Sequence, residues 1–514
     1  MAQRVLAGRF DIGYWKFEIK KSEEKNMFFK WRKNKIIDNR GGALIFALIF
    51  GTISFSLVVM GVSGYALYQN KLAMSKHARE MAFQISDAGV AYYRWHIFAN
   101  ENDYQDGTAT SGPYIHDYFD KNKNNIGKFS LDLTAPRTGS TVSTIKSTGW
   151  LNAYSGAKRT IKARVGKPSL TDYSFLTNSG IWIGEEELVH GKMHSNSGIR
   201  FDGETDSVVS SYLETYRCPS SQGCSGSPWK DGVWGTGSPD VFFTYPSTYK
   251  DFDLVNNKLD EIRTNAINFG VYLDGSPNRG WHIVFSTTTV GEDIVMQAKI
   301  YSVSTCEADG CSSNWRSSNY CGNYKCRTCY NTDYANPGAA GCCLDINSET
   351  LYLTTTSPEI AYFYSEKTTW VEGVVKGSVV VGSNRDIVIK GNLTYPEKSE
   401  ENILGLTAKN NVLIPYKVSS TLEIHASMIA QTGAVQRYNY SSGQNPYKTL
   451  SMIRVNGSVV SYKIWTFSWV NSSGVVVNGF QNTETTFNVF SLFNPPPSSP
   501  VGANHVLIEW QEIK

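Results

Sequence analysis

Residues 41–70 contain no charged side chain, which is the longest such gap in this 514-residue chain. The apolar part, Ala43–Tyr68, would span about 39 Å as a helix, more than the roughly 30 Å hydrocarbon core of a bilayer. A buried core helix is an alternative, but so long a stretch without charge argues against it. No Ala-x-Ala site follows, which argues against a cleaved secretory signal. We therefore expect one transmembrane helix.

The chain beyond residue 70 lacks a basic excess. Residues 1–40 hold 11 Lys and Arg against 5 Asp and Glu, whereas the remainder holds 38 basic and 41 acidic side chains. A body with this balance is not expected to bind nucleic acid by charge. Basic residues beside an apolar segment keep that end in the cytoplasm. We expect a single-pass membrane protein with a cytoplasmic N-terminus and an extracytoplasmic body.

No cysteine precedes residue 218, so every cysteine lies in the part expected outside the membrane. Seven of the nine fall between residues 306 and 343, among Gly, Ser, Asn and Tyr, where little apolar surface can be buried. Disulfides are favoured; zinc is the alternative, because two of the cysteines have Cys-x-x-Cys spacing. The odd count leaves one thiol unpaired or linked between chains. The expected disulfide cysteines are Cys218, Cys224, Cys306, Cys311, Cys321, Cys326, Cys329, Cys342 and Cys343.

Motifs for nucleotide or metal chemistry are also missing. Each Gly-Lys pair lacks the glycine that a Walker loop needs five residues earlier. Residues 102–113 place a glycine as in a calcium loop but lack acidic side chains at the third and twelfth positions. Glu187, His190 and His194 are the most metal-like cluster, yet the surrounding glycines favour strands and turns. We predict no cofactor, no metal site and no enzymatic activity.

An envelope enzyme acting on polysaccharide is a rival interpretation of the C-terminal half. Such enzymes gather acidic and basic side chains on one face, whereas the charges here are scattered and fit a solvated surface. Aromatic residues across 438–470 are a candidate glycan or surface groove, although aromatic residues in strands more often serve packing. The charged candidates are Arg385, Asp386, Lys390, Lys409 and Glu423.

A helical pattern continues after the apolar segment. Apolar residues recur at alternating spacings of four and three, which predicts one helix of about 55 residues. The single interruption, Gly89, would cost about 1 kcal/mol. The predicted stripe consists of Met74, Ala78, Met81, Ile85, Ala88, Tyr92 and Trp95.

Two segments, Asn39–Phe50 and Ala82–Gly89, carry a resemblance to a known family. They resemble type IV pilin-like proteins, in particular the PilX type of minor pilin. The resemblance implies that prepilin peptidase cuts a basic leader beside Gly41 or Gly42, so that Ala43 lies at the start of the mature helix. It also implies other pilin-like subunits and the pilus assembly machinery as partners, besides the membrane.

Two features depart from this family. Many pilins have Glu five residues into the mature helix, but here that place is Phe46 or Ala47. Some minor pilins and the tip pseudopilin of type II secretion systems also lack this residue. The leader is long as well, and a start at Met27 rather than Met1 would give it a usual length.

Beyond the helix, residues 101–126 are polar and are predicted to form a loop. Strand-like runs at 128–133, 141–147 and 159–165 predict an antiparallel meander like that of pilins. Farther along, residues 251–268 predict a helix with one apolar face, ending before Gly270.

A weak repeat lies in the C-terminal part. Val381–Ile389 aligns with Leu406–Ile414 at an offset of 25 residues, and Leu422–Ala430 and Ser458–Tyr462 continue the pattern. Short strands at this period predict coils of a parallel β-solenoid, with an ordinary sandwich as the alternative. Residues 405–412 and 494–497 resemble an uncharacterised exported domain that accompanies PilX-type anchors, a resemblance that brings no known activity.

The predicted fold class is α+β: a long N-terminal helix, a small antiparallel meander and a large β-rich region containing a parallel β-solenoid. The predicted function is a minor pilin-like subunit of a type IV pilus or related filament, located at the tip and involved in assembly or attachment. A cell-surface adhesin outside any filament is the alternative, and surface glycans are candidate ligands. The predicted segments are a leader at 1–42, the helix at 43–100, the meander at 101–170, an α+β domain at 171–305, a Cys-rich insertion at 306–345, and a solenoid-like domain with C-terminal strands at 346–514.

Overall fold

The computed structural model describes residues 42–514 apart from 138–139, 277–278, 309–319, 322–323, 326–342, 358–359, 400, 440–446, 472–474, 503 and 514. The predicted leader and most of the Cys-rich insertion therefore lie outside the described residues. The chain separates into two units, before and after the boundary between Met74 and Ser75. Within the described part the fold is α+β, with one long apolar helix followed by a large β-rich region.

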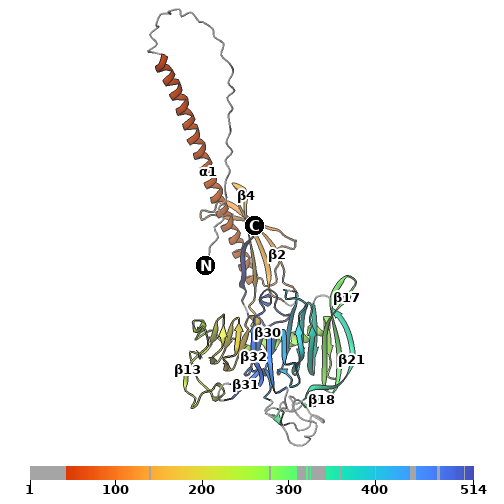
Figure 1. Ribbon diagram of the computed structural model, residues 1–514. Helices are drawn as coiled ribbons and strands as arrows, with labels where there is room; N and C mark the ends of the chain where they lie inside the picture. Colours follow the sequence, from red (N-terminus) through yellow and green to blue (C-terminus); the bar gives the residue numbers. More distant parts are fainter. Residues whose placement is uncertain are drawn as a thin grey trace, which may run out of the picture. The chain divides into compact units, whose positions relative to one another are not determined.

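Helix α1 comprises residues Gly42–Ala99, 58 residues without a break (Figure 1). Between residues 44 and 68 its large apolar side chains are exposed; Phe46 and Phe50, for example, are 76% and 75% exposed. Among the described residues, it is the one helix long and apolar enough to cross a membrane. The long apolar helix predicted from the sequence is confirmed.

The C-terminal part of α1 packs against an antiparallel sheet, but its buried face differs from the predicted stripe. Ala78 and Ile85 are buried as expected, whereas Met74 is 49% and Trp95 66% exposed. Relative to the predicted stripe, the contact face is rotated about the helix axis and includes small residues that were not predicted, which let the helix approach the strands closely. The buried residues are Ala78, Ala82, Ile85, Ser86, Gly89, Val90, Tyr93, His96 and Ile97.

Glycines on both partners make this close approach possible. A Cβ at Gly89 would lie 2.8 Å from the Phe129 ring, and one at Gly149 would overlap the Ala82 carbonyl and the Ser86 amide of the helix. Gly89, which the sequence suggested only as a tolerable interruption of the helix, is thus required for packing.

The sheet has the order β1-β2-β3-β4-β33 and is antiparallel throughout. The three predicted strands are present; β2 and β4 extend beyond the predicted ranges at both ends, whereas β3 both begins and ends later than predicted. One correction is β1, which lies in the segment predicted to be a loop. The other addition, β33, comes from the far C-terminus and pairs with β4. The strands are β1 Tyr114–Phe119, β2 Asn125–Thr134, β3 Ser143–Leu151, β4 Tyr154–Gly166 and β33 Val506–Ile513.

The rest of the chain forms mostly parallel sheets, one of them with 21 strands. The strands before residue 280 are short, and most of those that follow are longer. The first group comprises β5 Phe175–Thr177, β6 Ile181–Ile183, β7 Glu187–His190, β8 Met193–Ser195, β9 Ile199–Phe201, β10 Glu204–Thr205, β11 Val209–Ser211, β12 Thr215–Arg217, β13 Trp229–Asp231, β14 Val233–Trp234, β15 Phe243–Thr244 and β16 Val271–Leu273. The second group comprises β17 Gly280–Val290, β18 Asp293–Ala308, β19 Tyr320–Cys321, β20 Tyr324–Lys325, β21 Cys343–Ser357, β22 Ile360–Ser365, β23 Thr368–Val374, β24 Ser378–Ser383, β25 Ile387–Thr394, β26 Ile403–Ala408, β27 Val412–Ile414, β28 Thr421–Ala430, β29 Val435–Arg437, β30 Thr449–Ser461, β31 Ser468–Val470 and β32 Val476–Thr486.

The main parallel ladder does not follow chain order. Its strands run β15-β11-β8-β5-β30-β28-β26-β24-β22-β16, so the first strand of this region, β5, pairs with β30. Val459 faces Phe175 across that junction. In Figure 1, β30 and β32 accordingly lie between the yellow strands near β13 and the cyan and green strands near β21.

The 25-residue repeat predicted from the sequence corresponds to neighbouring strands in register. Val381 pairs with Leu406, and Ile387 pairs with Val412, both at the predicted offset. Small side chains occupy one column of this ladder where the strands end and the chain turns. The column is Ser365, Ser383, Ala408, Ala430, Ser461, Thr177, Ser195 and Ser211.

Two further helices accompany the ladder: α2 Asn256–Phe269 and the short α3 Phe490–Phe493. The predicted helix at 251–268 begins later than expected, because residues Phe252–Val255 form a 3-10 turn. Leu259, Ile262 and Ala266 are buried against tyrosines of β22, as the apolar face predicted, whereas Ile267 is 53% exposed. The remaining 3-10 turns are Leu170–Asp172, Ser220–Gln222 and Asp240–Phe242.

Candidate functional site

The predicted processing site lies at the edge of the described residues. Gly41 is outside them, and α1 begins at Gly42, with Ala43 as its second residue. The first turn of the helix contains no acidic residue. Cleavage at this site stays a prediction.

Asp87, the acidic residue of the second pilin-like segment, contacts the C-terminal strand. Its Oδ1 accepts a hydrogen bond from Trp510 Nε1 at 3.0 Å, and the Trp510 ring packs edge-on against Phe83 at 5.7 Å. In this structure, Asp87 therefore helps to hold β33 against α1.

Two of the nine predicted disulfide cysteines have described side chains, and they form a disulfide, Cys218–Cys224. The other seven side chains lie outside the described residues. The bond closes a short loop in which Gln222 is buried, 2% exposed. Gln222 Nε2 donates to the Ile181 carbonyl at 2.8 Å, so the loop is attached to strand β6.

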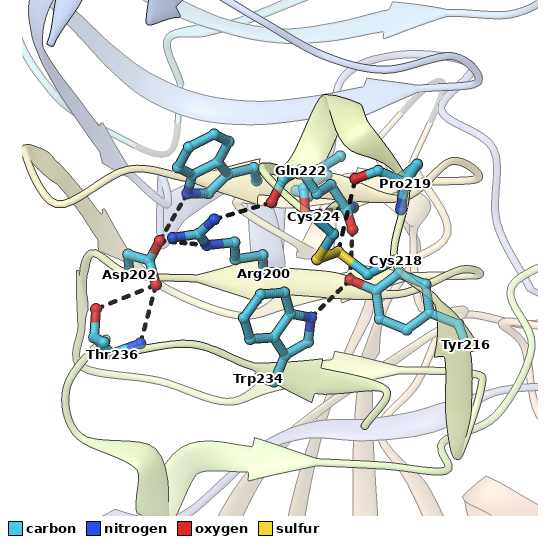
Figure 2. A network of polar contacts seen from close by, with 11 residues as sticks. Arg200, Asp202, Tyr216, Cys218, Pro219, Gln222, Cys224, Trp234 and Thr236 are labelled. Atoms are coloured by element: carbon cyan, nitrogen blue, oxygen red, sulfur yellow. Dashed lines mark hydrogen bonds and ion pairs between the residues drawn. A yellow bond between two sulfur atoms is a disulfide. The ribbon is translucent and has the colours of Figure 1, made fainter. Parts of the chain in front are cut away.

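Next to this loop, three side chains stack across the parallel sheet β6-β9-β14. Trp182, Arg200 and Trp234 occupy paired positions on these strands. The guanidinium of Arg200 lies 4.1 Å from the Trp182 ring centre and 5.2 Å from that of Trp234. Figure 2 shows Arg200 between the two indoles, with the disulfide loop beside them.

Asp202 binds this stack from one side. Its Oδ2 accepts from Arg200 Nε at 2.7 Å and from Trp182 Nε1 at 2.8 Å, and its Oδ1 accepts from the Thr236 amide at 3.0 Å (Figure 2). On the other side, Trp234 Nε1 donates to the Tyr216 hydroxyl at 2.9 Å. The polar groups of this network satisfy one another, which makes it a structural clasp rather than an open binding site.

The metal-like cluster of the sequence does not converge on one point. His190 Nδ1 lies 2.7 Å from Asp206 Oδ2, while His194 is buried with its Nδ1 2.9 Å from Ser210 Oγ. Burial raises the pKa of Glu187 to about 8. Among the described residues, no group of three or more His, Cys, Asp or Glu side chains is arranged to hold a metal ion.

The charged candidates of the C-terminal half each have a different partner. Asp386 is buried and accepts from Asn411 Nδ2 at 2.8 Å, a link between neighbouring turns. Lys390 donates to Glu372 at 2.9 Å and Lys409 to Asn384 at 3.2 Å. The Arg385 amide donates to Ser383 Oγ at 3.1 Å, within a turn. Of the five, Glu423 lines a cavity.

That cavity, called the ladder groove below, lies over β28, β30 and β32 and measures about 50 Å³. Glu423, Arg454 and Glu484 are paired in register across the three strands, and so are His425, Asn456 and Thr486. The groove is lined by Lys398, Glu423, His425, Arg454, Val455, Asn456, Glu484 and Thr486.

One ion pair and one histidine–carboxylate hydrogen bond organise the ladder groove. Arg454 Nε donates to Glu484 Oε2 at 3.1 Å, and His425 Nε2 lies 2.8 Å from Glu423 Oε1. His425 is 5% exposed, and its Nδ1 accepts from the Tyr395 amide at 3.3 Å. Burial lowers the pKa of His425, so its ring is neutral at neutral pH.

Sequence reasoning missed this groove except for Glu423. The available signal was the alternation Glu-x-His, Arg-x-Asn and Glu-x-Thr at residues 423, 454 and 484, since alternate residues of a strand face the same side. The offsets between these strands differ from 25 residues, so the repeat period did not align them.

Comparison with known proteins adds little to these observations. No family model and no curated protein matches the sequence. Among solved structures, the chain is similar to the competence-associated pilin ComZ from Thermus thermophilus, with 12% identity over 85% of this chain and 97% of that one. The TM-score is 0.28, which is too low to establish a common fold.

Proposed function

We propose that this protein is a membrane-anchored, pilin-like subunit of a type IV pilus or a related filament, whose β-rich body contacts surfaces. One observation carries the proposal: a single 58-residue helix combines an exposed apolar N-terminal part with a C-terminal part packed on an antiparallel sheet. An apolar helix with no charge in residues 41–70 suits storage in a membrane before assembly. The basic leader supports a cytoplasmic N-terminus.

The test of this role is the N-terminus of the mature protein. We expect intact-mass and N-terminal peptide measurements on protein from its native host to give a chain that starts at Gly42 or Ala43. The same protein should be found in sheared filament fractions. A mature chain that retains Arg40, or one that starts beyond Tyr65, contradicts prepilin-type processing.

A location at the filament tip is the finer part of the proposal. The body is much larger than the first sheet, and copies at shaft spacing would clash. The first turn of α1 has no acidic residue to neutralise the N-terminal amine of a neighbouring subunit. A subunit with no neighbour ahead of it does not need that charge, and an unpaired carboxylate in an apolar core costs several kcal/mol.

Immunogold labelling of sheared filaments tests the tip location. We expect sparse terminal labels and loss of filaments on deletion of the gene. Dense labelling along the shafts argues against it, and labelling of the cell surface without filaments favours the adhesin.

The parallel ladders support a second structural proposal, that the body is a β-solenoid. Strand pairs at a 25-residue offset are what successive coils produce. The variant Asn384→Cys/Lys409→Cys tests the offset, because these residues directly follow Ser383 and Ala408, which pair across β24 and β26. We expect an intramolecular cross-link on mild oxidation, detected by peptide mapping; cross-links only between molecules contradict the register.

A further inference from the structure

The ladder groove contains polar side chains whose hydrogen-bonding capacity the protein does not use. Within the described part of the chain, the side chains of Lys398, Asn456 and Thr486 have no hydrogen-bond partner. Arg454 uses its Nε for Glu484, and its two terminal nitrogens have no partner among the described residues. Free donors and acceptors thus converge on one cavity.

The clasp in Figure 2 provides the contrast. There Arg200 is covered by two indoles, and Asp202 receives donors on both carboxylate oxygens. A ligand would have to break those contacts. At the ladder groove a ligand would form new hydrogen bonds without displacing an internal partner of Asn456 or Thr486 among the described residues.

Charge balance restricts the chemistry of the ligand. Lys398 and Arg454 are cationic, Glu423 and Glu484 are anionic, and the buried ring of His425 is neutral, so the lining has no net charge. An anionic group would face the two carboxylates, and a cationic group would face the ammonium and guanidinium. A neutral group that both donates and accepts hydrogen bonds, such as a hydroxyl, can bind to the carboxylates as well as to the cationic side chains.

Size adds a second restriction. The cavity of about 50 Å³ exceeds the roughly 10–15 Å³ that a cavity needs to hold one water. It can therefore admit the hydroxyl-bearing edge of a sugar ring while the rest of the ring stays on the surface. The three strands repeat at about 4.8 Å, which places successive rows of polar groups along a linear ligand.

We propose that the ladder groove binds the hydroxyl-bearing edge of an uncharged sugar unit in a surface glycan. This assignment rests on the proposed surface-contacting function of the body. Arg454 and Lys398 donate to sugar oxygens, Glu423 and Glu484 accept from sugar hydroxyls, and Asn456 and Thr486 do both.

The test uses the full-length protein in detergent micelles and an array of neutral, acidic and amino-bearing oligosaccharides. We expect wild-type protein to bind at least one neutral oligosaccharide, with affinity measured by calorimetry. The variant Asn456→Ala/Thr486→Ala should lose about three- to tenfold in affinity for each neutral hydrogen bond removed. Its thermal unfolding should be unchanged, because neither side chain has a partner in the described protein.

A second variant and a control separate binding from folding. Arg454→Met removes charged donors and should weaken binding about tenfold or more. Thr421→Ala is the matched control: this exposed residue is on β28, two positions before Glu423, and does not line the groove. It should bind like wild type.

Three results would overturn the assignment: no neutral oligosaccharide binds, only charged ones bind, or affinity is unchanged in both groove variants. These failures are distinct from failure of the pilin role. A protein that enters filaments without binding neutral glycans refutes the groove alone, whereas one that binds them but is never processed or assembled refutes the filament role alone.

Discussion

The contribution of an ion pair to the stability of this protein depends on how far its two side chains are buried. Arg200 and Asp202 are an ion pair whose side chains are 23% and 4% exposed, whereas the side chains of Arg454 and Glu484 are 52% and 35% exposed. Water screens the second pair, and the first is also covered by indole rings. The two arginines make comparable contacts with a carboxylate, yet they should affect stability very differently.

We therefore predict that Arg200→Met destabilises the protein by about 3 kcal/mol, because Asp202 then remains buried without its cation. The matched variant Arg454→Met should cost at most about 1 kcal/mol. Urea unfolding followed by tryptophan fluorescence measures both. Equal effects from the two variants would show that burial does not govern these pairs.

A second prediction at this scale concerns Glu372. The His282 ring, whose Nε2 lies 3.2 Å away, and the Lys390 ammonium hold the pKa of this carboxyl at about 2. Because the folded pKa is below the unfolded one, the stabilisation is fully present above about pH 4.5 and is lost as the pH falls toward 2.

Glu372→Gln should consequently lower the free energy of unfolding at pH 6, and the difference from wild type should shrink below pH 4.5. Urea unfolding at a series of pH values gives this comparison. A difference that stays constant between pH 6 and pH 3 would assign the effect to packing rather than charge.

At the scale of elements, the contact between α1 and the antiparallel sheet depends on missing side chains. Gly149 of β3 faces the helix backbone, where a Cβ would overlap the Ala82 carbonyl and the Ser86 amide. Backbone atoms cannot rotate away as a side-chain tip can. The helix must shift to admit even one methyl group.

Gly149→Ala should therefore destabilise the first sheet by about 1–3 kcal/mol, the usual cost of overpacking. Gly156→Ala on β4 is the control, since a Cβ there meets nothing within 4 Å. Hydrogen exchange of β2 and β3 amides measures the change. If both variants exchange at the same rate, the helix does not rest on the strands as described.

At the scale of the whole molecule, distant segments of the chain complete each other's sheets. Strand β33 adds the last strand to a sheet formed mainly by residues 114–166, and β5 pairs with β30 across an interval of more than 270 residues. Closing such long intervals of chain costs conformational entropy, which the contacts at these two junctions must offset.

Deleting residues 505–514 should expose the edge of β4 and remove the contacts of Glu512 with Arg159, of Glu509 with Arg164 and of Trp510 with Asp87. We expect faster hydrogen exchange in β4 and the C-terminal part of α1, with protection unchanged in β24 and β26. The control is Glu512→Gln, which removes only the partly exposed ion pair with Arg159 and should change hydrogen exchange little. Loss of protection throughout the ladder would show that both sheets unfold as one unit.

The sequence by itself determined the elements whose signal is local. A stretch without charge specified α1, an apolar face specified α2, and the 25-residue spacing specified which residues of β24, β25, β26 and β27 pair. Each of these depends on periodicity within one segment, or on the similarity of adjacent segments, which a single sequence displays directly.

Only the tertiary structure decided which of these segments contact one another. The pairing of β5 with β30, the return of β33 to β4 and the rotation of α1 onto Gly89 depend on contacts between residues far apart in the chain. The ladder groove belongs to the same class, because Glu423, Arg454 and Glu484 become neighbours only when three strands lie in register. Which strands pair depends on side-chain packing and burial over whole strand faces, and a local pattern of residues does not reveal these.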